Sequence, residues 1–348
     1  MTKVAIITCH DVYNHGASLQ AYALSHYVSS LGCDVRIIDY KPPYLSRHYS
    51  LTAVNNPKWD YPILRYVYLL AKLPQRLANL KNKRRFDEFT KRMLPLTRRY
   101  RSIDELRSEP PQADIYIAGS DQIWNPIFPN GRDSAFFLDF GPKQTARISY
   151  AASFAIPEIP SEEISGMTRR LKLLDVISIR ERSGLSVLQS MGLNGTYVCD
   201  PVWLLDRNQW LNIANGAQLP QLPSRYLLAY GMGPVQDIAE RVADEARTQG
   251  LPVISVGDYI RDTLFLPDIG PKEFLALIKN AETIVTNSYH GLIFASIFGT
   301  RYIPMMRNDL PNERLNDFLA TSDAQRAELI DLSRQYLISH LKFSKSAL

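Results

Sequence analysis

Short apolar runs alternate with segments of helical periodicity along most of the chain. Near the N-terminus, residues 4–8 and 34–40 have the β-branched, apolar character of buried strands. Between them, residues 18–31 repeat apolar positions with the spacing of a helix that ends at Gly32. The three segments together have the size of one βαβ unit. Repetition of this pattern predicts an α/β fold with parallel sheets.

The same alternation returns in two later blocks. In the first block we predict strands at 114–119, 148–152, 176–179 and 197–199, with helices at 161–175 and 184–191. In the second block we predict strands at 226–230, 253–256, 283–287 and 302–305, with helices at 235–249, 271–281 and 290–298. Between residues 42 and 111 the alternation stops, and proline-punctuated helices are predicted instead.

This order of elements predicts two Rossmann-like, doubly wound domains that face a cleft. The N-terminal domain is expected at residues 1–214, with a helical insertion at about 42–111, and the C-terminal domain at 225–311. Residues 215–224 are typical of a linker, and residues 312–348 are predicted to form a helical tail that packs back across the domains. Ligands of such sheets bind beyond the carboxyl ends of the strands.

Composition and cysteine content are typical of a cytosolic globular protein. The chain has 348 residues, of which 45% are hydrophobic and 22% are charged, which suits two folded domains. Cys9, Cys33 and Cys199 are too far apart for a disulfide framework or a Cys-x-x-Cys metal site. The first apolar run is too short for a signal peptide, and no apolar window is long enough to span a membrane. We therefore expect a cytoplasmic protein.

Positive charge is concentrated in the predicted insertion. From Arg65 to Arg107 there are 13 Lys or Arg residues and 4 Asp or Glu residues, whereas the whole chain has a net charge of only +5. Such a stretch attracts an anionic lipid surface or an anionic glycan, and the alternative is a solvated helical face. Nucleic acid is not expected, because the stretch matches no nucleic-acid-binding module.

Two loops after predicted strands carry groups suited to ligand binding. Asn14 and Gly16 precede a helix whose first amides are unpaired, although a turn followed by a Ser18 N-cap explains the same residues. The sequence GSDQIWNP places Ser120, Asp121, Gln122 and Asn125 at a strand end with Trp124, as in many sugar sites. An Asx turn with a core tryptophan is the alternative there.

Arg180 and His290 are the candidate catalytic residues. Arg180 closes a buried strand, which leaves a guanidinium at the edge of the cleft, where it suits a carboxylate or a phosphate. Arg182 is the alternative cation, and both arginines could instead pair with Glu181 at the surface. His290 stands at a strand-to-helix turn, beside unpaired helix amides that attract anions.

These segments together resemble the polysaccharide pyruvyl transferase family across nearly the whole chain. The resemblance is carried by the Asn14-x-Gly16 loop, GSDQIWNP, YAASF at 150–154, SIRERS at 178–183, Asp200-Pro201 and NSYHGLIFASIFG from Asn287. It implies a fold similar to the GT-B glycosyltransferases. It also implies transfer of the pyruvyl group of phosphoenolpyruvate onto two hydroxyls of a sugar, as a cyclic ketal, in bacterial polysaccharide biosynthesis.

The resemblance also assigns residues to the two substrates. Donor binding is expected from Arg180 and from the turn of Ser288, Tyr289, His290 and Gly291. The acceptor or the cleft lining is expected from Asn14, Gly16, Ser120, Asp121, Gln122 and Asn125. Family members often carry an arginine where this chain has Ser288, so Lys143, Arg147 or Arg301 are further candidate cations. No metal or other cofactor is expected.

Two other functions fit the same features. A sugar-nucleotide glycosyltransferase of the same shape would bind a diphosphate at the helix of His290, and a non-catalytic glycan-binding protein would use the cleft for recognition alone. For the pyruvyl transferase we expect a saccharide acceptor built on a lipid pyrophosphate carrier. The basic stretch would then hold the protein reversibly at the inner membrane surface.

Overall fold

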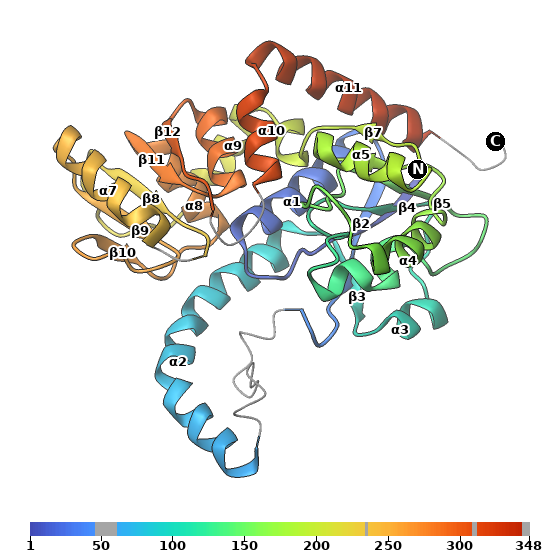
Figure 1. Ribbon diagram of the computed structural model, residues 1–348, viewed down its shortest axis with the longest axis horizontal. Helices are drawn as coiled ribbons and strands as arrows, with labels where there is room; N and C mark the ends of the chain where they lie inside the picture. The colour runs from blue at the N-terminus through green and yellow to red at the C-terminus, as the bar shows by residue number, and fades with distance from the viewer. Residues whose placement is uncertain (46–60, 234–235, 308–311, 343–348) are drawn as a thin grey trace.

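The computed structural model describes residues 1–45, 61–233, 236–307 and 312–342, and it contains two five-stranded parallel sheets (Figure 1). The first sheet has the order β3-β2-β1-β4-β5 and the second the order β10-β9-β8-β11-β12, so each chain half winds outward from a central strand in both directions. The expected α/β fold with two doubly wound sheets is confirmed. The strands of the first sheet are β1 (Lys3–Ile7), β2 (Asp34–Tyr40), β3 (Leu96–Tyr100), β4 (Ile115–Ala118) and β5 (Ala146–Ser149). Those of the second are β8 (Leu227–Tyr230), β9 (Val253–Val256), β10 (Leu264–Leu266), β11 (Thr283–Thr286) and β12 (Arg301–Pro304).

Helices cover the faces of both sheets, because strands such as β4 and β11 are buried along their whole length. The α-helices are α1 (His15–Ser30), α2 (Pro62–Met93), α3 (Ile103–Ser108), α4 (Ser161–Leu171), α5 (Arg182–Ser190), α6 (Arg207–Ala214), α7 (Gln236–Gln249), α8 (Pro271–Asn280), α9 (Tyr289–Phe298), α10 (Glu313–Ala320) and α11 (Asp323–Leu341). Short 3₁₀ helices lie at η3 (Pro129–Arg132), η4 (Ser134–Phe137) and η5 (Pro201–Leu204), and β6 (Ser178–Ile179) pairs with β7 (Thr196–Tyr197).

The two halves share one apolar core, which fixes their relative placement. Leu19 of α1 belongs to the same buried cluster as Trp210, Phe274 and Phe294 of the helices that follow. His15 joins the halves directly, because its ring stacks on Phe274 with a centroid distance of 4.5 Å. Its Nδ1 lies 3.0 Å from the Tyr230 hydroxyl, and its Nε2 lies 2.8 Å from the carbonyl of Ile269.

The winding order places two loop pairs at one edge of the molecule. In the first sheet the chain changes direction between β1 and β4, and in the second between β8 and β11. The loops after these four strands therefore diverge and leave a crevice at their carboxyl ends. They contain Asn14, Asp121, Met232 and Ser288 respectively, so the predicted site residues lie at the expected edge.

The region between residues 42 and 111 differs from its prediction. Where the structure describes it, this region holds the 32-residue helix α2, which continues through Pro74, the edge strand β3 of the first sheet and the short helix α3. Helix α1 also begins earlier than expected: its N-cap is Asn14, whose Oδ1 accepts a hydrogen bond from the amide of Ala17. Ser18 is therefore a buried residue inside the helix. Among the described helices, none has an apolar stretch long enough to cross a bilayer.

The C-terminal helices α10 and α11 contact both halves of the molecule (Figure 1). Helix α10 packs against α9, and α11 lies on the first half, where the Tyr336 hydroxyl donates to the carbonyl of Ser149. Ser333 accepts a hydrogen bond from the amide of Cys199. As a result, residues of α10 reach the edge where the loops of both sheets meet.

Candidate functional site

A cavity of about 210 Å³ lies at the carboxyl ends of both sheets. Its lining comes from the loops after β1, β4, β8 and β11, from residues 155 and 307, and from the first turns of α9 and α10. The residues are Val12, Asn14, Asp121, Gln122, Asn125, Ala155, Met232, Asn287, Ser288, Tyr289, His290, Arg307, Arg314 and Leu315. Most of the residues that the sequence analysis selected therefore surround one space.

The imidazole of His290 is fixed in this wall from two sides. His290 occupies the first turn of α9, and its Nε2 lies 3.4 Å from Oδ2 of Asp200. Its ring also packs against Gly16 of α1, because a Cβ atom at position 16 would lie only 2.0 Å from Nδ1 of His290. The glycine of the Asn14-x-Gly16 loop thus leaves room for the histidine of the other chain half.

Asp200 is a buried carboxylate that contacts two basic side chains. Its Oδ1 caps η5 by accepting the amide of Val202 at 3.1 Å, while its Oδ2 faces Arg180 at 2.5 Å and His290 at 3.4 Å. Burial alone would raise the pKa of Asp200, but the charges of His290 and Arg180 outweigh it and hold this pKa well below its usual range. Asp200 is therefore ionised and orients the histidine ring.

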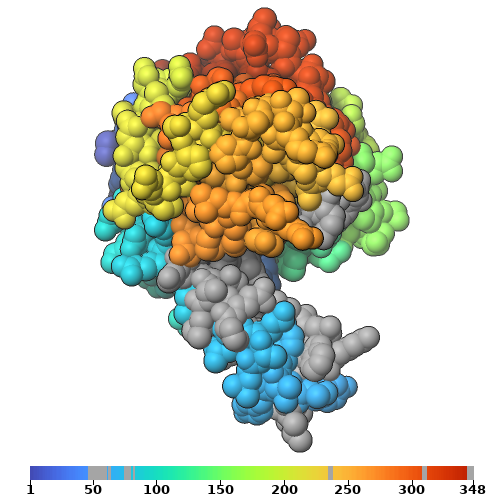
Figure 2. All heavy atoms as spheres, turned by 90° about the vertical axis from the view of Figure 1, so that its left-hand side faces the viewer, coloured from blue at the N-terminus to red at the C-terminus, as the bar shows by residue number. Residues whose placement is uncertain are grey.

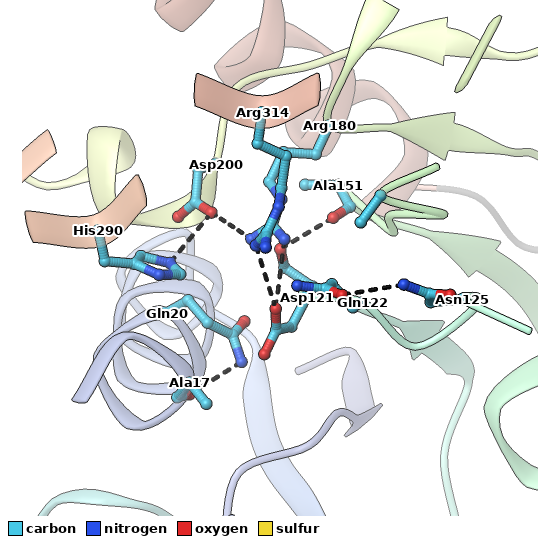
Figure 3. Close-up of polar contacts among 12 residues, drawn as sticks. Ala17, Gln20, Asp121, Gln122, Asn125, Ala151, Arg180, Asp200, His290 and Arg314 are labelled. Carbon is cyan, nitrogen blue, oxygen red and sulfur yellow. Dashed lines mark hydrogen bonds and ion pairs between the residues drawn. The ribbon is translucent and has the colours of Figure 1, made fainter. Parts of the chain in front are cut away.

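Arg180 lies deeper than the sequence analysis expects. Its guanidinium is fully buried between Asp200 and Asp121, at 3.2 Å from Oδ1 of Asp121, rather than at the edge of the cleft (Figure 3). Burial alone would lower the pKa of Arg180, but the two carboxylates raise it above its ordinary value. The expectation of an edge position was wrong because the sequence does not reveal that both carboxylates converge on this side chain.

Arg314 is a cation of the cavity wall that was not predicted from the sequence. It comes from α10, its side chain is 19% exposed, and its guanidinium lies 4.0 Å from Oδ1 of Asp121 (Figure 3). Arg180 and Arg314 both lie over the ring of Tyr289, at 5.3 and 5.5 Å from its centroid. Burial, together with the charge of Arg180, lowers the pKa of Arg314, although a guanidinium remains a cation at neutral pH.

Asp121 links the two arginines at the cavity wall. Its side chain is 17% exposed, and it adopts a left-handed backbone conformation with φ of 82° in the loop after β4. Burial alone would raise the pKa of Asp121, but Arg180, Arg314 and His290 lower it below its ordinary value. Basic and acidic side chains therefore alternate along this wall, in the order His290, Asp200, Arg180, Asp121 and Arg314.

The GSDQIWNP segment divides between the cavity and the core. Gln122 and Asn125 line the cavity with Asp121, and the Asn125 amide donates to Oε1 of Gln122 at 3.1 Å. Ser120, expected in the cleft, is instead fully buried, and its hydroxyl donates to the carbonyl of Ala151. Trp124 is also buried, with its indole N–H bound to the carbonyl of Phe136. The core-tryptophan alternative is therefore the correct one.

The turn before α9 is held by its own side chains. Ser288 is the N-cap of α9, and its hydroxyl accepts a hydrogen bond from the amide of Gly291 at 3.3 Å. The amide of Gly291 is thus occupied within the protein. Asn287 binds both backbone groups of Met232, at 2.7 and 3.0 Å, and so fastens the loop after β11 to the loop after β8.

The other candidate cations do not line this cavity. The guanidinium of Arg147 is buried and donates to backbone carbonyls, among them those of Leu138 and Phe140. Lys143 and Arg301 are exposed outside the cavity lining.

Neighbours of Arg180 on β6 and α5 also differ from the expected surface pair. Arg182 lies 3.8 Å from Asp317. Glu181 is buried and accepts hydrogen bonds from the amides of Phe154 and Ala155, so it does not pair with an arginine at the surface.

Comparison with known proteins shows which family the chain belongs to. The family model described as polysaccharide pyruvyl transferase matches residues 14–309, which include every predicted site residue and all strands of both sheets except β1. The chain belongs to the polysaccharide pyruvyl transferase family. A comparison with curated protein sequences gives no significant match.

Solved structures similar to this pyruvyl transferase family member include three sugar-related proteins. The UDP-GlcNAc 2-epimerase of Methanocaldococcus jannaschii has 12% identity and a TM-score of 0.49, with coverage of 99% of this chain and 94% of that one. The UDP-GlcNAc 2-epimerase of Neisseria meningitidis has 8% identity and a TM-score of 0.48, with coverage of 99% and 95%. Anabaena HepE, in complex with UDP and glucose, has 9% identity and a TM-score of 0.46, with coverage of 100% and 97%.

The extent of the family match explains why the place of Arg314 in the cavity was not predicted from the sequence. Arg314 lies beyond residue 309, outside the segment that matches the pyruvyl transferase family. Its approach to Asp121 depends on α10 packing against α9, which is a tertiary contact. No local motif around Arg314 indicates that position.

Proposed function

We propose that this protein transfers the pyruvyl group of phosphoenolpyruvate onto two hydroxyls of a sugar, forming a cyclic ketal. The observation that carries the proposal is the placement of His290, backed by the ionised carboxylate of Asp200, in one cavity wall with the guanidinium of Arg314. A proton carrier and a cation beside one small space suit a donor that has an anionic head and a carbon to protonate.

The donor is assigned to the end of the cavity formed by α9 and α10. Phosphoenolpyruvate brings a carboxylate and a phosphate, and Arg314 and Arg307 both line the cavity. The N-terminal end of α9 adds the partial positive charge of its first turn. These groups would replace the arginine that the family often carries at the position of Ser288, while Arg180 acts as a positioning residue through Asp121 and Asp200.

The size of the cavity favours this donor over a sugar nucleotide. Pockets for drug-sized ligands have volumes of about 300–1,000 Å³. The cavity here measures about 210 Å³, which suits a small anion more than a nucleoside diphosphate sugar. The glycosyltransferase alternative is correspondingly weaker.

The chemistry requires one proton on carbon and two new carbon–oxygen bonds. We assign proton donation to the imidazole of His290, which lines the cavity and is held at Nε2 by Asp200. The methylene carbon of phosphoenolpyruvate takes this proton, and the first sugar hydroxyl adds to the neighbouring carbon. The carbon–oxygen bond to phosphate then breaks, and the second hydroxyl closes the ketal. Of the two hydroxyl protons, one restores His290 and the other leaves on the phosphate.

The acceptor is assigned to the side of the cavity formed by the first chain half. Asn14, Gln122 and Asn125 present amides there, which suit the hydroxyls of a saccharide. We propose that this saccharide is an intermediate of bacterial polysaccharide synthesis carried on a lipid pyrophosphate, and that the reaction takes place on the cytoplasmic side of the inner membrane.

The test measures inorganic phosphate released from phosphoenolpyruvate in the presence of lipid-linked or nitrophenyl galactosides, glucosides and mannosamines. We expect phosphate release that depends on one of these acceptors, with an acid-labile pyruvyl product. Acceptor-dependent release of UDP or GDP from a sugar nucleotide would instead identify a glycosyltransferase. If phosphoenolpyruvate is neither bound nor consumed while glycans bind, the protein is a glycan-binding module.

A further inference from the structure

The N-terminal half of α2 projects from the body of the molecule and carries exposed apolar side chains. In both views the light-blue segment extends away from the rest of the molecule (Figures 1 and 2). Its exposed large hydrophobic residues are Tyr61, Leu64, Tyr66, Val67, Leu70 and Leu73. Tyr66 and Leu70 are each 69% exposed, and Val67 is 54% exposed. Apolar groups concentrated on one projecting segment indicate an interaction surface.

The charge of the same segment limits the choice of partner. Residues 62–86 contain seven Lys or Arg residues and no Asp or Glu residue. Two copies of such a segment repel each other, whereas an anionic surface attracts it. Helices that lie in a membrane interface combine apolar and aromatic side chains with Lys and Arg in this way.

The base of the projecting segment contacts the loop of the candidate site. Lys83 lies 5.3 Å over the ring of Tyr13, and the Tyr13 hydroxyl donates to Asp87 at 3.2 Å. The neighbours of Tyr13 in the chain, Val12 and Asn14, line the cavity. A partner surface that binds α2 therefore lies close to this loop of the cavity.

We propose that the segment from Tyr61 to Leu73 is an interfacial membrane-binding helix that inserts Tyr66, Val67 and Leu70 among the headgroups of an anionic bilayer. This mode of binding goes beyond the electrostatic attraction of a basic stretch, because the apolar side chains supply part of the binding free energy. The cations at the base of the segment are not the main contact, because each is paired within the protein. Lys83 pairs with Asp87, Arg84 with Glu88, and Arg85 with Glu273. Membrane binding by this segment does not depend on the reaction proposed above.

The test uses flotation of the full chain with phosphatidylcholine vesicles that contain or lack phosphatidylglycerol. We expect binding to the anionic vesicles only, with part of it retained at high salt. The double variant Val67→Gln/Leu70→Gln should lower the bound fraction roughly tenfold. The matched control Leu332→Gln/Ile338→Gln changes residues of α11 that are 52% and 38% exposed, and it should bind like the unmodified protein.

A second readout reports insertion directly. Because the three native cysteines are buried, Tyr66→Cys can be labelled selectively with an environment-sensitive fluorophore. Its emission should shift to the blue with anionic vesicles, whereas a label at Ile338→Cys should not respond. The proposal is overturned if the Tyr66→Cys label does not respond, if the double variant binds vesicles normally, or if the same residues instead drive self-association of the protein without lipid.

Discussion

Gly16 and His290 lie in direct contact although they belong to different halves of the chain. A side chain at position 16 would need the space that the imidazole occupies, since its Cβ would lie 2.0 Å from Nδ1 of His290. Asp200 meets the same ring at Nε2, 3.4 Å away. The orientation of the histidine is therefore determined jointly by a helix of the first half and a buried carboxylate.

Replacement of Gly16 by alanine tests this contact. Alanine favours a helix more than glycine does, so the fold of α1 should be preserved, while the ring of His290 must move. We expect turnover to fall roughly 10²-fold, the cost of misplacing a catalytic group by about 1 Å. Steady-state kinetics and circular dichroism measure the two effects.

Gly166→Ala is the matched control for this variant. Gly166 lies in α4, where an added Cβ would meet only the end of Arg170, at 3.7 Å. It should leave turnover unchanged. Normal turnover in Gly16→Ala would contradict the role assigned to His290 in this geometry.

Removing the guanidinium of Arg180 should destabilise the fold. Arg180→Met leaves the buried carboxylates of Asp200 and Asp121 without their shared partner. Breaking a buried ion pair in this way costs about 3–5 kcal/mol of the free energy of unfolding. The control Arg225→Met breaks an exposed pair with Glu282 and should cost less than about 1 kcal/mol. Urea unfolding compares the two variants, and equal costs would mean that the buried pair adds no more stability than an exposed one.

The donor site should respond to a change of Arg314. Arg314→Gln removes one of the cations that line the cavity but retains hydrogen-bonding capacity. We expect the KM for phosphoenolpyruvate to rise at least roughly tenfold, with a small change in the KM for the acceptor. Arg301→Gln, outside the cavity lining, serves as the control and should leave both constants unchanged. A rise confined to the acceptor KM would move Arg314 to the acceptor site.

Stability should fall at mildly acidic pH because of His15. Burial lowers the pKa of His15 to about 4, from 6.5 for an exposed histidine, despite its bond to Ile269. The unfolded chain thus binds more protons than the folded chain between these values, and the free energy of unfolding rises with pH across this window by about 3 kcal/mol from His15 alone. His15→Gln should flatten this rise, whereas His26→Gln at an exposed position should not. Equal pH dependence in all three proteins would contradict the assignment.

Apolar periodicity predicted the central strands and the helices beside them, because β1, β4, β8 and β11 are buried along nearly their whole length. Two of the edge strands, β3 and β10, were not predicted. β3 has the sequence LTRRY, in which Arg98 and Arg99 are exposed, so it lacks an apolar signal. β10 has only three residues. Edge strands face solvent on one side, and their pairing depends on neighbours that are distant in the sequence.

For the candidate site, the sequence predicted which loops meet but not how deep each side chain lies. His290, Asp121 and Asn14 follow strands, so the topology alone places them at one edge. The depth of Arg180 depends on Asp121 and Asp200 converging from separate segments, and the place of Arg314 depends on the docking of α10. Such convergence is a property of the packed molecule and has no local pattern.

The measurement that tests the central claim most directly compares unmodified protein with His290→Gln, each incubated with phosphoenolpyruvate and the nitrophenyl glycosides, by phosphate release and product mass. We predict a pyruvylated glycoside and equimolar phosphate from the unmodified protein. In His290→Gln the rate should be lower by about 10²–10⁴-fold, as for loss of a general acid, with an unchanged melting temperature. Equal rates of product formation in both proteins would contradict the account.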